Sequence, residues 1–274
     1  MKKTIMLILA LSLVAGSAFA QVSLAKVKDG VYFAQDQKYS SSGWKEQVVL
    51  TIKGGKIIDA IWNGVSNIAG AADKVSYATA GKYGMVKASK IKAEWDAQSK
   101  AVADYLVKTQ DVNFAKLNKD GKTDAITGAT MTVSGFFALV KEALSSAPVA
   151  KGSYKDGWYF AQQADFDKSS GWKDSALVTV VNGSIVDVVW NGLSKDPAKK
   201  SKIVEAVSGR YGMAKAAKKG EWNVQAEAVE AAIVKAGDPS KIALKADGTS
   251  DAVSGASIHL SVVTLAIEAL KAAK

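Results

Sequence analysis

The sequence predicts an α+β fold built as two tandem copies of one domain, each a small antiparallel sheet with packed helices. Three observations predict it: the halves repeat one another, a strand–turn–strand pattern opens each half, and helical patterns close each half. Lys28–Gln35 recurs at Lys155–Gln162, and Asp124–Thr130 recurs at Asp251–Ser257. A repeat of this length is a duplicated domain, because solenoid repeats run about 20–50 residues.

The strands are predicted by composition and by the turns between them. Residues 30–35 and 46–52 are rich in β-branched and aromatic residues, which favour strands. Gly54-Gly55 follows, and Asn182-Gly183 stands at the matching place in the second copy. Both dipeptides tolerate the positive φ angles of a tight hairpin, so a hairpin is expected, with its second strand running to about Trp62.

The helices are predicted by apolar residues that recur with helical spacing. One such face follows Tyr83-Gly84-Met85, and another ends each copy. The first face holds Trp95, Val102, Tyr105 and Leu106; the last helix of copy one holds Val133, Phe136, Phe137, Val140 and Leu144; its counterpart in copy two holds Leu260, Val263, Ile267 and Leu270.

The domain boundaries follow from the repeat and from the N-terminal segment. Lys2 and Lys3, the apolar run 5–14 and the small residues Ala18 and Ala20 are typical of a signal peptide cleaved before Gln21. We therefore expect a signal peptide over 1–20, copy one over 21–147, a linker over 148–152 and copy two over 153–274. The mature chain is expected to be periplasmic or otherwise extracytoplasmic, with no integral membrane span.

Composition excludes several kinds of site. The chain has no cysteine and one histidine, which argues against disulfides, thiolate metal sites and thiol catalysis. Its formal net charge is +10, but the lysines are interspersed with acidic residues. Such a pattern is typical of a solvated surface rather than of a nucleic-acid site.

The segment Asp124–Thr130 carries the most specific signal. It is a loop of small residues that runs into the last helix of copy one, and Thr127 or Thr130 is expected to cap that helix. Gly128 permits a close backbone approach or a left-handed φ. Free N–H groups at a helix start would suit a phosphate, whereas a cap that binds nothing explains the same residues.

This segment, Asp-Ala-Ile-Thr-Gly-Ala-Thr, resembles the Asp-x-x-Ser/Thr-Gly-Ala-Thr motif of the FMN-binding domain. That domain occurs in the C subunit of the sodium-translocating NADH:quinone reductase, in the G subunit of the RNF complex and in exported flavoproteins. The resemblance implies covalent FMN joined to Thr130 by a phosphoester, made by a flavin transferase that uses FAD and a divalent metal. It also implies recognition or loop roles for Asp124 and Gly128. The other candidate cofactor-binding residues of the two motifs are Thr127, Ala129, Asp251, Ser254, Gly255 and Ala256. Copy two ends its motif in Ser257 rather than threonine, so a second flavin there is an open question.

The flavin ring would need an aromatic or apolar wall. The candidates are Trp44, Trp62, Tyr83 and Trp95, with Trp172, Trp190, Tyr211 and Trp222 in copy two. Each of these side chains is also a candidate for the hydrophobic core. Five other residues could suggest a functional site but have a simpler interpretation. We interpret Asp59 and Asp187 as pairing with the backbone or a lysine, Met85 and Met213 as packing residues, and His259 as a surface residue.

The sequence thus favours an exported flavoprotein with one or two covalent FMN groups, which moves electrons between membrane donors and extracytoplasmic acceptors. A carrier is preferred to a stand-alone enzyme because no substrate-binding domain is visible, and the flavin itself would supply the redox chemistry. Two alternatives stay open: a flavin-free module that binds glycan or protein through exposed aromatic residues, and a store of non-covalent flavin.

Overall fold

A computed structural model describes residues 21–274, so the expected signal peptide lies outside the described residues. Copy one opens with a short 3-10 helix and a three-stranded antiparallel sheet of order β1-β2-β3, and four helices follow. Its elements are the 3-10 helix Leu24–Lys26, β1 (Gly30–Gln35), β2 (Trp44–Lys53), β3 (Lys56–Ser66), α1 (Lys74–Thr79), α2 (Met85–Ala88), α3 (Trp95–Thr109) and α4 (Ser134–Ser145).

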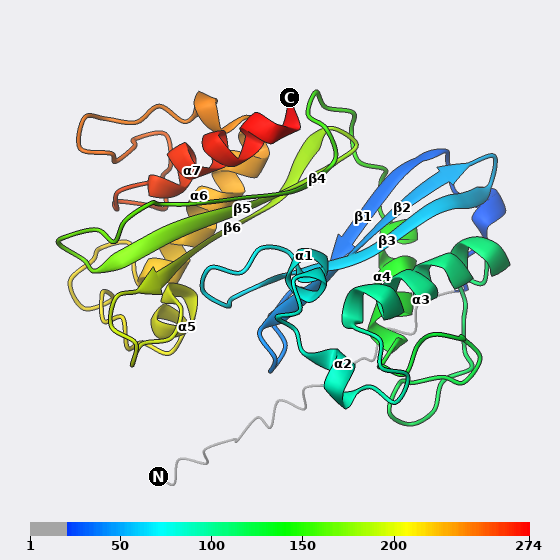
Figure 1. Cartoon of the computed structure of the whole chain (residues 1–274). Coiled ribbons are helices and arrows are strands. Elements are labelled where there is room, and N and C mark those ends of the chain that lie inside the picture. Colours follow the sequence, from blue (N-terminus) through cyan, green and yellow to red (C-terminus); the bar gives the residue numbers. More distant parts are fainter. Residues whose placement is uncertain (1–20) are drawn as a thin grey trace, which may run out of the picture.

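Copy two repeats this plan with a sheet of order β4-β5-β6, which confirms the predicted α+β class. Figure 1 shows the two copies as separate halves of the ribbon, each with its own sheet and helices. The elements are β4 (Gly157–Gln162), β5 (Trp172–Val181), β6 (Ser184–Ser194), α5 (Lys202–Val207), α6 (Trp222–Ala236), the 3-10 helix Pro239–Lys241, α7 (Ser261–Ala269) and the 3-10 helix Leu270–Ala273.

The predicted hairpins are present. Gly54 and Gly55 have φ angles of 59° and 69°, and Asn182 and Gly183 have 51° and 77°, as a two-residue turn between antiparallel strands requires. The second strand of the first hairpin is longer than expected, because β3 continues past Trp62 to Ser66, opposite Trp44.

The predicted helical faces are largely confirmed. In α3 and α4 the buried residues include Trp95, Val102, Leu106, Phe136 and Val140, as the spacing indicated. In copy two the prediction for Ile267 was wrong, since 37% of its surface is exposed. The regular helix α7 stops at Ala269, two residues beyond Ile267, and a 3-10 turn carries Leu270 into the core instead.

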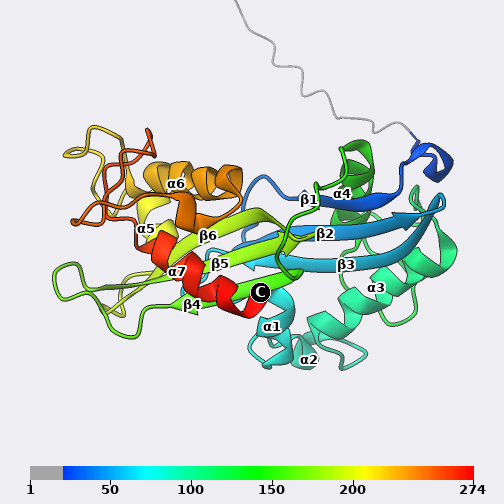
Figure 2. The same ribbon diagram turned by 90° about the horizontal axis from the view of Figure 1, so that it is seen from above.

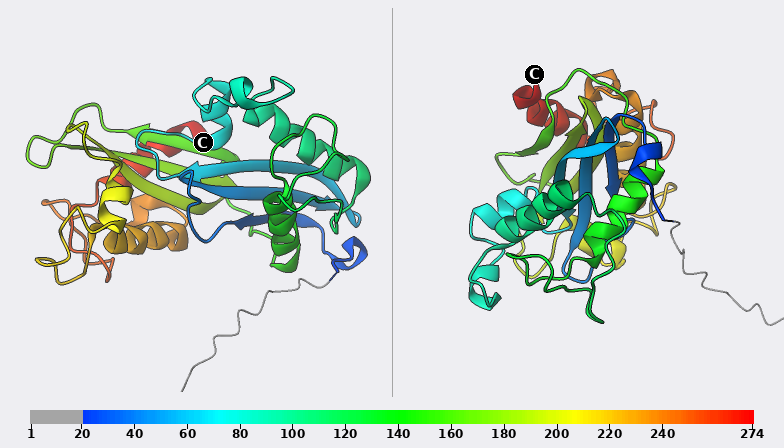
Figure 3. Two further views of the ribbon diagram at one scale, coloured as in Figure 1. Left: turned by 90° about the horizontal axis from the view of Figure 1, so that it is seen from below. Right: turned by 90° about the vertical axis from the view of Figure 1, so that its right-hand side faces the viewer.

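The helices of each copy lie on its own sheet. Helices α3 and α4 pack on the strands of copy one, and α6 and α7 pack on those of copy two. In Figure 2 the strands of both copies run through the middle of the view, α3 and α6 lie toward its edges, and α7 lies over the strands of copy two. The same arrangement is visible from below in Figure 3.

The two copies contact one another through buried side chains. Val65 of β3 is fully buried and belongs to the hydrophobic core of copy two. Gln47 of β2 is also fully buried; its amide nitrogen donates to Asp187 Oδ2 at 3.1 Å, and its amide oxygen accepts from Trp158 Nε1 at 2.6 Å. Asp187, interpreted from sequence as a pairing residue, therefore joins the two halves. No helix within residues 21–274 has the length and apolar character needed to cross a membrane.

Candidate functional site

The Thr130 hydroxyl is held by a buried glutamine of the neighbouring helix. Gln98 of α3 is fully buried, and its Oε1 accepts from the Thr130 N–H at 2.8 Å and from Thr130 Oγ1 at 3.2 Å. The amide nitrogen of Gln98 donates to Ser89 Oγ and to the Ala93 carbonyl, both at 3.0 Å. Ser89 Oγ lies 3.4 Å from Thr130 Oγ1, so the side chains of Gln98 and Ser89 together fix the position of this hydroxyl.

Copy two builds the same arrangement around its serine. Gln225 of α6, also fully buried, accepts from the Ser257 N–H at 2.8 Å and from Ser257 Oγ at 3.3 Å. Its amide nitrogen donates to the Gly220 carbonyl at 3.1 Å. Thr130 is half-buried, whereas Ser257 is exposed. Gln98 and Gln225 each follow the helix-starting tryptophan by three residues, a recurring signal that the sequence analysis did not use.

The motif loop approaches the helix closely at its glycines. Gly128 has a φ of 91°, and a Cβ there would lie 3.1 Å from the Ala101 Cβ of α3. A Cβ on Gly255 would lie 2.5 Å from the Ala228 Cβ of α6, closer than carbon atoms pack. The small residue at each position therefore lets the loop lie against the helix that carries the glutamine.

The predicted helix cap was wrong. Helix α4 begins at Ser134 with Val133 as its N-cap residue and no side-chain cap, so neither Thr127 nor Thr130 caps it. Two N–H groups at this end, those of Val133 and Ser134, donate to the Gly121 carbonyl at 2.8 and 3.1 Å. A phosphate on Thr130 would thus be placed by the motif loop and not by the first turn of α4.

The other motif residues divide into buried and exposed groups. Ala129 is buried, and Ala256 is half-buried against the core of copy two. The side chains of Asp124, Thr127, Asp251 and Ser254 are exposed, and Asp251 pairs with Lys245 at 2.5 Å. Exposed acidic and hydroxyl groups at these places are accessible to another protein, which is the position a recognition residue needs.

The predicted aromatic residues gather around a buried lysine in each copy. Lys74 Nζ lies 4.3 Å from the ring centre of Trp95, 5.1 Å from Tyr83 and 5.6 Å from Trp44. Trp62 lies behind them, with its ring centre 5.5 Å from that of Trp95. In copy two, Lys202 Nζ takes the same place among the rings of Trp172, Trp190, Tyr211 and Trp222. These two lysines are buried, which corrects the expectation that the lysines are surface residues.

A carboxylate pairs with each buried lysine. Glu46 Oε1 lies 2.5 Å from Lys74 Nζ, and Glu46 Oε2 accepts from Trp62 Nε1 at 2.9 Å. Burial raises the pKa of Glu46 and lowers the pKa of Lys74, and their mutual attraction opposes both shifts. In copy two, Asp174 Oδ1 lies 2.9 Å from Lys202 Nζ, and Asp174 Oδ2 accepts from Ser261 Oγ at 2.5 Å.

In copy two the aromatic rings also line an open pocket of about 370 Å³. Ligand pockets in proteins typically enclose about 300–1,000 Å³. The residues that follow Ser257, Ile258 and His259, line this pocket. It therefore brings aromatic faces, a lysine and the motif loop together; its lining includes Trp172, Asp174, Lys202, Tyr211, Met213 and Trp222.

Comparisons with known proteins give relatives but no activity. No protein-family model matches the chain, and no curated protein matches it. A protein from Clostridium thermocellum, solved by NMR, is 44% identical; the match covers 43% of this chain and 90% of that one, with a TM-score of 0.34. A crystal structure from Clostridium perfringens is 23% identical, over 43% of this chain and 87% of that one, with a TM-score of 0.30. Neither Clostridium protein carries a name that states a function.

Proposed function

We propose that this protein is an exported flavoprotein that carries covalent FMN and transfers electrons between membrane donors and extracytoplasmic acceptors. The observation that carries the proposal is the fixed hydroxyl of Thr130, which stands in the last position of the Asp-x-x-Thr-Gly-Ala-Thr segment. Gln98 and Ser89 hold that hydroxyl in place, and the half-buried position leaves it accessible.

The surroundings of Thr130 suit a phosphate group. Ser89, which lies against Thr130, is the C-cap residue of α2, and the exposed Lys87, Lys90 and Lys92 lie in α2 and in the segment that follows it. Copy two has Lys215, Lys218 and Lys219 in its corresponding loop, and Lys219 Nζ donates to the carbonyl of the motif residue Ser254 at 2.8 Å. Clustered cations of this kind favour the negative charge of a nearby phosphodiester through electrostatic attraction.

The chemistry of the residues also suits a flavin ring. Isoalloxazine is flat and largely apolar, with polar edges, and ligand sites for such groups combine aromatic walls with a few polar side chains. The pocket of copy two has this composition, with Trp172, Tyr211 and Trp222 beside Lys202. FMN, when bound, supplies the one- and two-electron redox chemistry, and the chain orients it and sets its electrostatic environment.

Within this proposal the residues of the chain have distinct tasks. Thr130 Oγ1 would carry the phosphoester, and Gln98 Oε1 holds the loop through the Thr130 N–H whether or not the hydroxyl is modified. The glycines Gly128 and Gly255 keep the loop against its helix. A covalent link prevents loss of the cofactor by diffusion, which matters for a protein outside the cytoplasm.

The proposal is tested by a substitution and a matched control. Thr130→Ala should remove all covalent flavin from copy one, measured by in-gel flavin fluorescence of full-length protein made with a flavin transferase and with Ser257→Ala in the background. Thr132→Ala is the control, because Thr132 is an exposed hydroxyl only two residues away whose Oγ1 donates to the Asp120 carbonyl. Fluorescence that persists in Thr130→Ala would exclude Thr130 as the attachment point.

The alternative of a module that grips ligands with exposed aromatic residues has less support. Six of the seven tryptophans, all but Trp158, are buried in the described structure. Trp44, Trp62 and Trp95 expose 5% of their surface or less, so they are not available on an open face. Their position agrees with the core role that the sequence analysis left open for them.

A further inference from the structure

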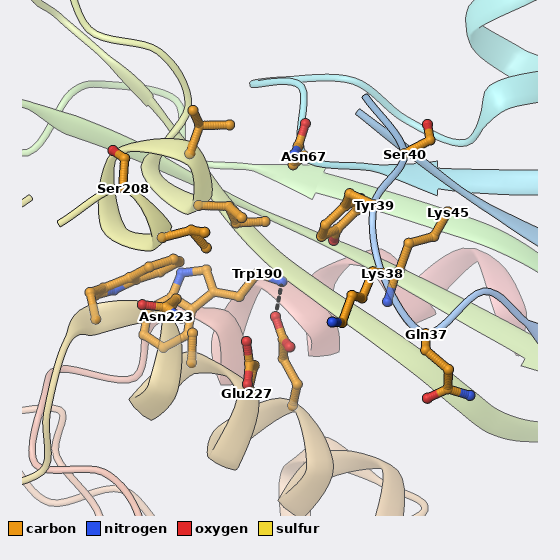
Figure 4. Close-up of a pocket in the computed structure, with 16 residues that line it drawn as sticks. Gln37, Lys38, Tyr39, Ser40, Lys45, Asn67, Trp190, Ser208, Asn223 and Glu227 are labelled. Atoms are coloured by element: carbon orange, nitrogen blue, oxygen red, sulfur yellow. Dashed lines mark hydrogen bonds between the residues drawn. The ribbon is translucent and has the colours of Figure 1, made fainter. Parts of the chain in front are cut away.

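A pocket of about 660 Å³ lies between the two copies, separate from the Thr130 site. One wall is the loop of copy one that joins β1 to β2, with Lys38 and Tyr39, together with Lys45 at the start of β2. The opposite wall comes from β6, α5 and α6 of copy two, and Figure 4 shows the two walls facing one another.

The pocket has an apolar side and a charged side. Ile203, Val204, Val207, Trp190 and Trp222 form the apolar side. The charged side holds Lys38, Lys45, Glu227 and Glu230, with Tyr39 between the two sides in Figure 4. Trp190 and Trp222 are buried beneath this surface, whereas Val207 is exposed and Tyr39 is half-buried, so an aliphatic side chain and an aromatic ring offer a flat ligand a packing surface.

The charges of this pocket favour an anion near neutral pH. Burial raises the pKa of Glu230 to about 8, with the backbone hydrogen bond from Trp190 and the charge of Lys45 opposing this rise and Asp187 and Glu227 adding to it. Burial also raises the pKa of Tyr39, and the nearby acids Glu230, Asp187 and Glu227 add to this rise, so Tyr39 stays neutral. Lys38 and Lys45 line the pocket together with Glu227 and Glu230, and a Glu230 carboxyl that keeps its proton leaves the balance of charge on the side of the lysines.

We propose that this junction pocket binds a small aromatic monoanion, with its ring on the apolar side and its charged group against Lys38 and Lys45. The proposal does not depend on flavin, because the pocket is lined by neither Thr130 nor Ser257. It identifies the ligand by chemistry alone: a flat ring system that carries one carboxylate or an equivalent anionic group.

Three probes of nearly equal shape test the charge preference: 2-naphthoate, 2-naphthalenemethanol and 2-naphthylmethylammonium. We expect isothermal titration of the mature full-length protein at pH 7 to show one saturable site, with the anion bound at least about tenfold more tightly than the cation. Equal affinity for all three probes, or no saturable binding, would overturn the proposal.

Variants locate the site and its charge. Lys45→Met should weaken 2-naphthoate at least about fivefold while leaving 2-naphthalenemethanol unchanged, because the hydrogen bond or ion pair to the anion is lost. Lys173→Met is the matched control, since Lys173 holds the corresponding position in copy two and does not line the pocket. An unchanged affinity for 2-naphthoate in Lys45→Met would contradict the assignment.

The affinity for 2-naphthoate should also fall as the pH rises through about 8, because Glu230 then ionises beside the anion. Glu230→Gln should remove this step in the pH profile. A profile that is the same in the wild type and in Glu230→Gln would exclude a place for Glu230 next to the bound anion.

Discussion

The two copies share the same order of strands and helices but differ in the hydrogen bonds that the buried polar side chains around Lys74 and Lys202 make. In copy one, Glu46 reaches both Lys74 and Trp62 Nε1. In copy two, Asp174 is shorter by one methylene and bonds Lys202 and Ser261, and the buried Trp190 Nε1 has no hydrogen-bond partner among residues 21–274. Similarly, Asp73 accepts from Asn63 in copy one, whereas Ser201 stands in its place in copy two and the Asn191 amide nitrogen has no partner within the same described part of the chain.

This difference shows that duplication preserved the fold while relaxing one polar centre. Buried donors without partners are rare in native proteins and call for water or a ligand. They occur here in the copy whose aromatic residues line a pocket and whose motif ends in serine. Copy two has also gained Glu230 where copy one has the small, buried Ala103.

The largest effect that the comparison predicts comes from removing a buried lysine. Lys74→Met should lower the free energy of unfolding by about 3–5 kcal/mol, because it leaves Glu46 buried without its partner. Lys202→Met should cost a similar amount, since Asp174 is buried as well. Urea denaturation measures both, and Lys100→Met, which breaks only an exposed pair with Asp104, is the control. Losses as small as the control's would mean that these pairs do not stabilise the core.

The second effect is a pH dependence specific to copy two. The pKa of Glu230 is raised from 4.5 to about 8 in the folded protein, so ionising it opposes folding. The loss of folding free energy caused by ionising Glu230 is absent below the pKa of Glu230 in the unfolded chain. It grows by at most about 1.4 kcal/mol per pH unit and is complete above the pKa of Glu230 in the folded protein. The wild type should therefore lose stability relative to Glu230→Gln between pH 4.5 and 8.

Denaturation midpoints measured across this pH range test the prediction. Glu268→Gln is the control, because Glu268 is an exposed residue of α7 that does not contribute to the raised pKa of Glu230, and it should leave the slope as it is in the wild type. Parallel profiles for the wild type and Glu230→Gln would show that Glu230 is already ionised below pH 7.

The smallest effect is expected when the carboxylate residues Glu46 and Asp174 are each replaced by the residue of the other copy. Glu46→Asp should destabilise copy one by about 1–3 kcal/mol, because Trp62 Nε1 would lose its acceptor. Asp174→Glu should stabilise copy two by about 0.5–1.5 kcal/mol by giving Trp190 Nε1 an acceptor. The free energies of unfolding of the two variants should change in opposite directions, and a change of the same sign would refute the one-methylene explanation.

Local patterns allowed the strands, hairpins and long helices to be predicted, because hydrophobic periodicity and the Gly54-Gly55 turn act over a few residues. The motif loop was found, but the helix cap was misplaced, since Thr130 bonds Gln98 on another helix. Lys74 and Lys202 look like surface residues in the sequence, and only the packing of four distant aromatic side chains makes them buried. Contacts between the copies, such as Gln47 with Asp187, leave no local pattern at all.

The covalent FMN proposed on Thr130 is tested most directly by the mass of the native protein. Mature protein purified from its native host should weigh one FMN phosphoester more than the chain that begins at Gln21, with the added mass on the Thr130 peptide. The Ser257 peptide should be partly modified. A flavin transferase whose site fits the threonine methyl group would react with serine about 10–200-fold more slowly, which slows the attachment without preventing it. An unmodified Thr130 peptide in native protein that had been exposed to an active flavin transferase would contradict the account.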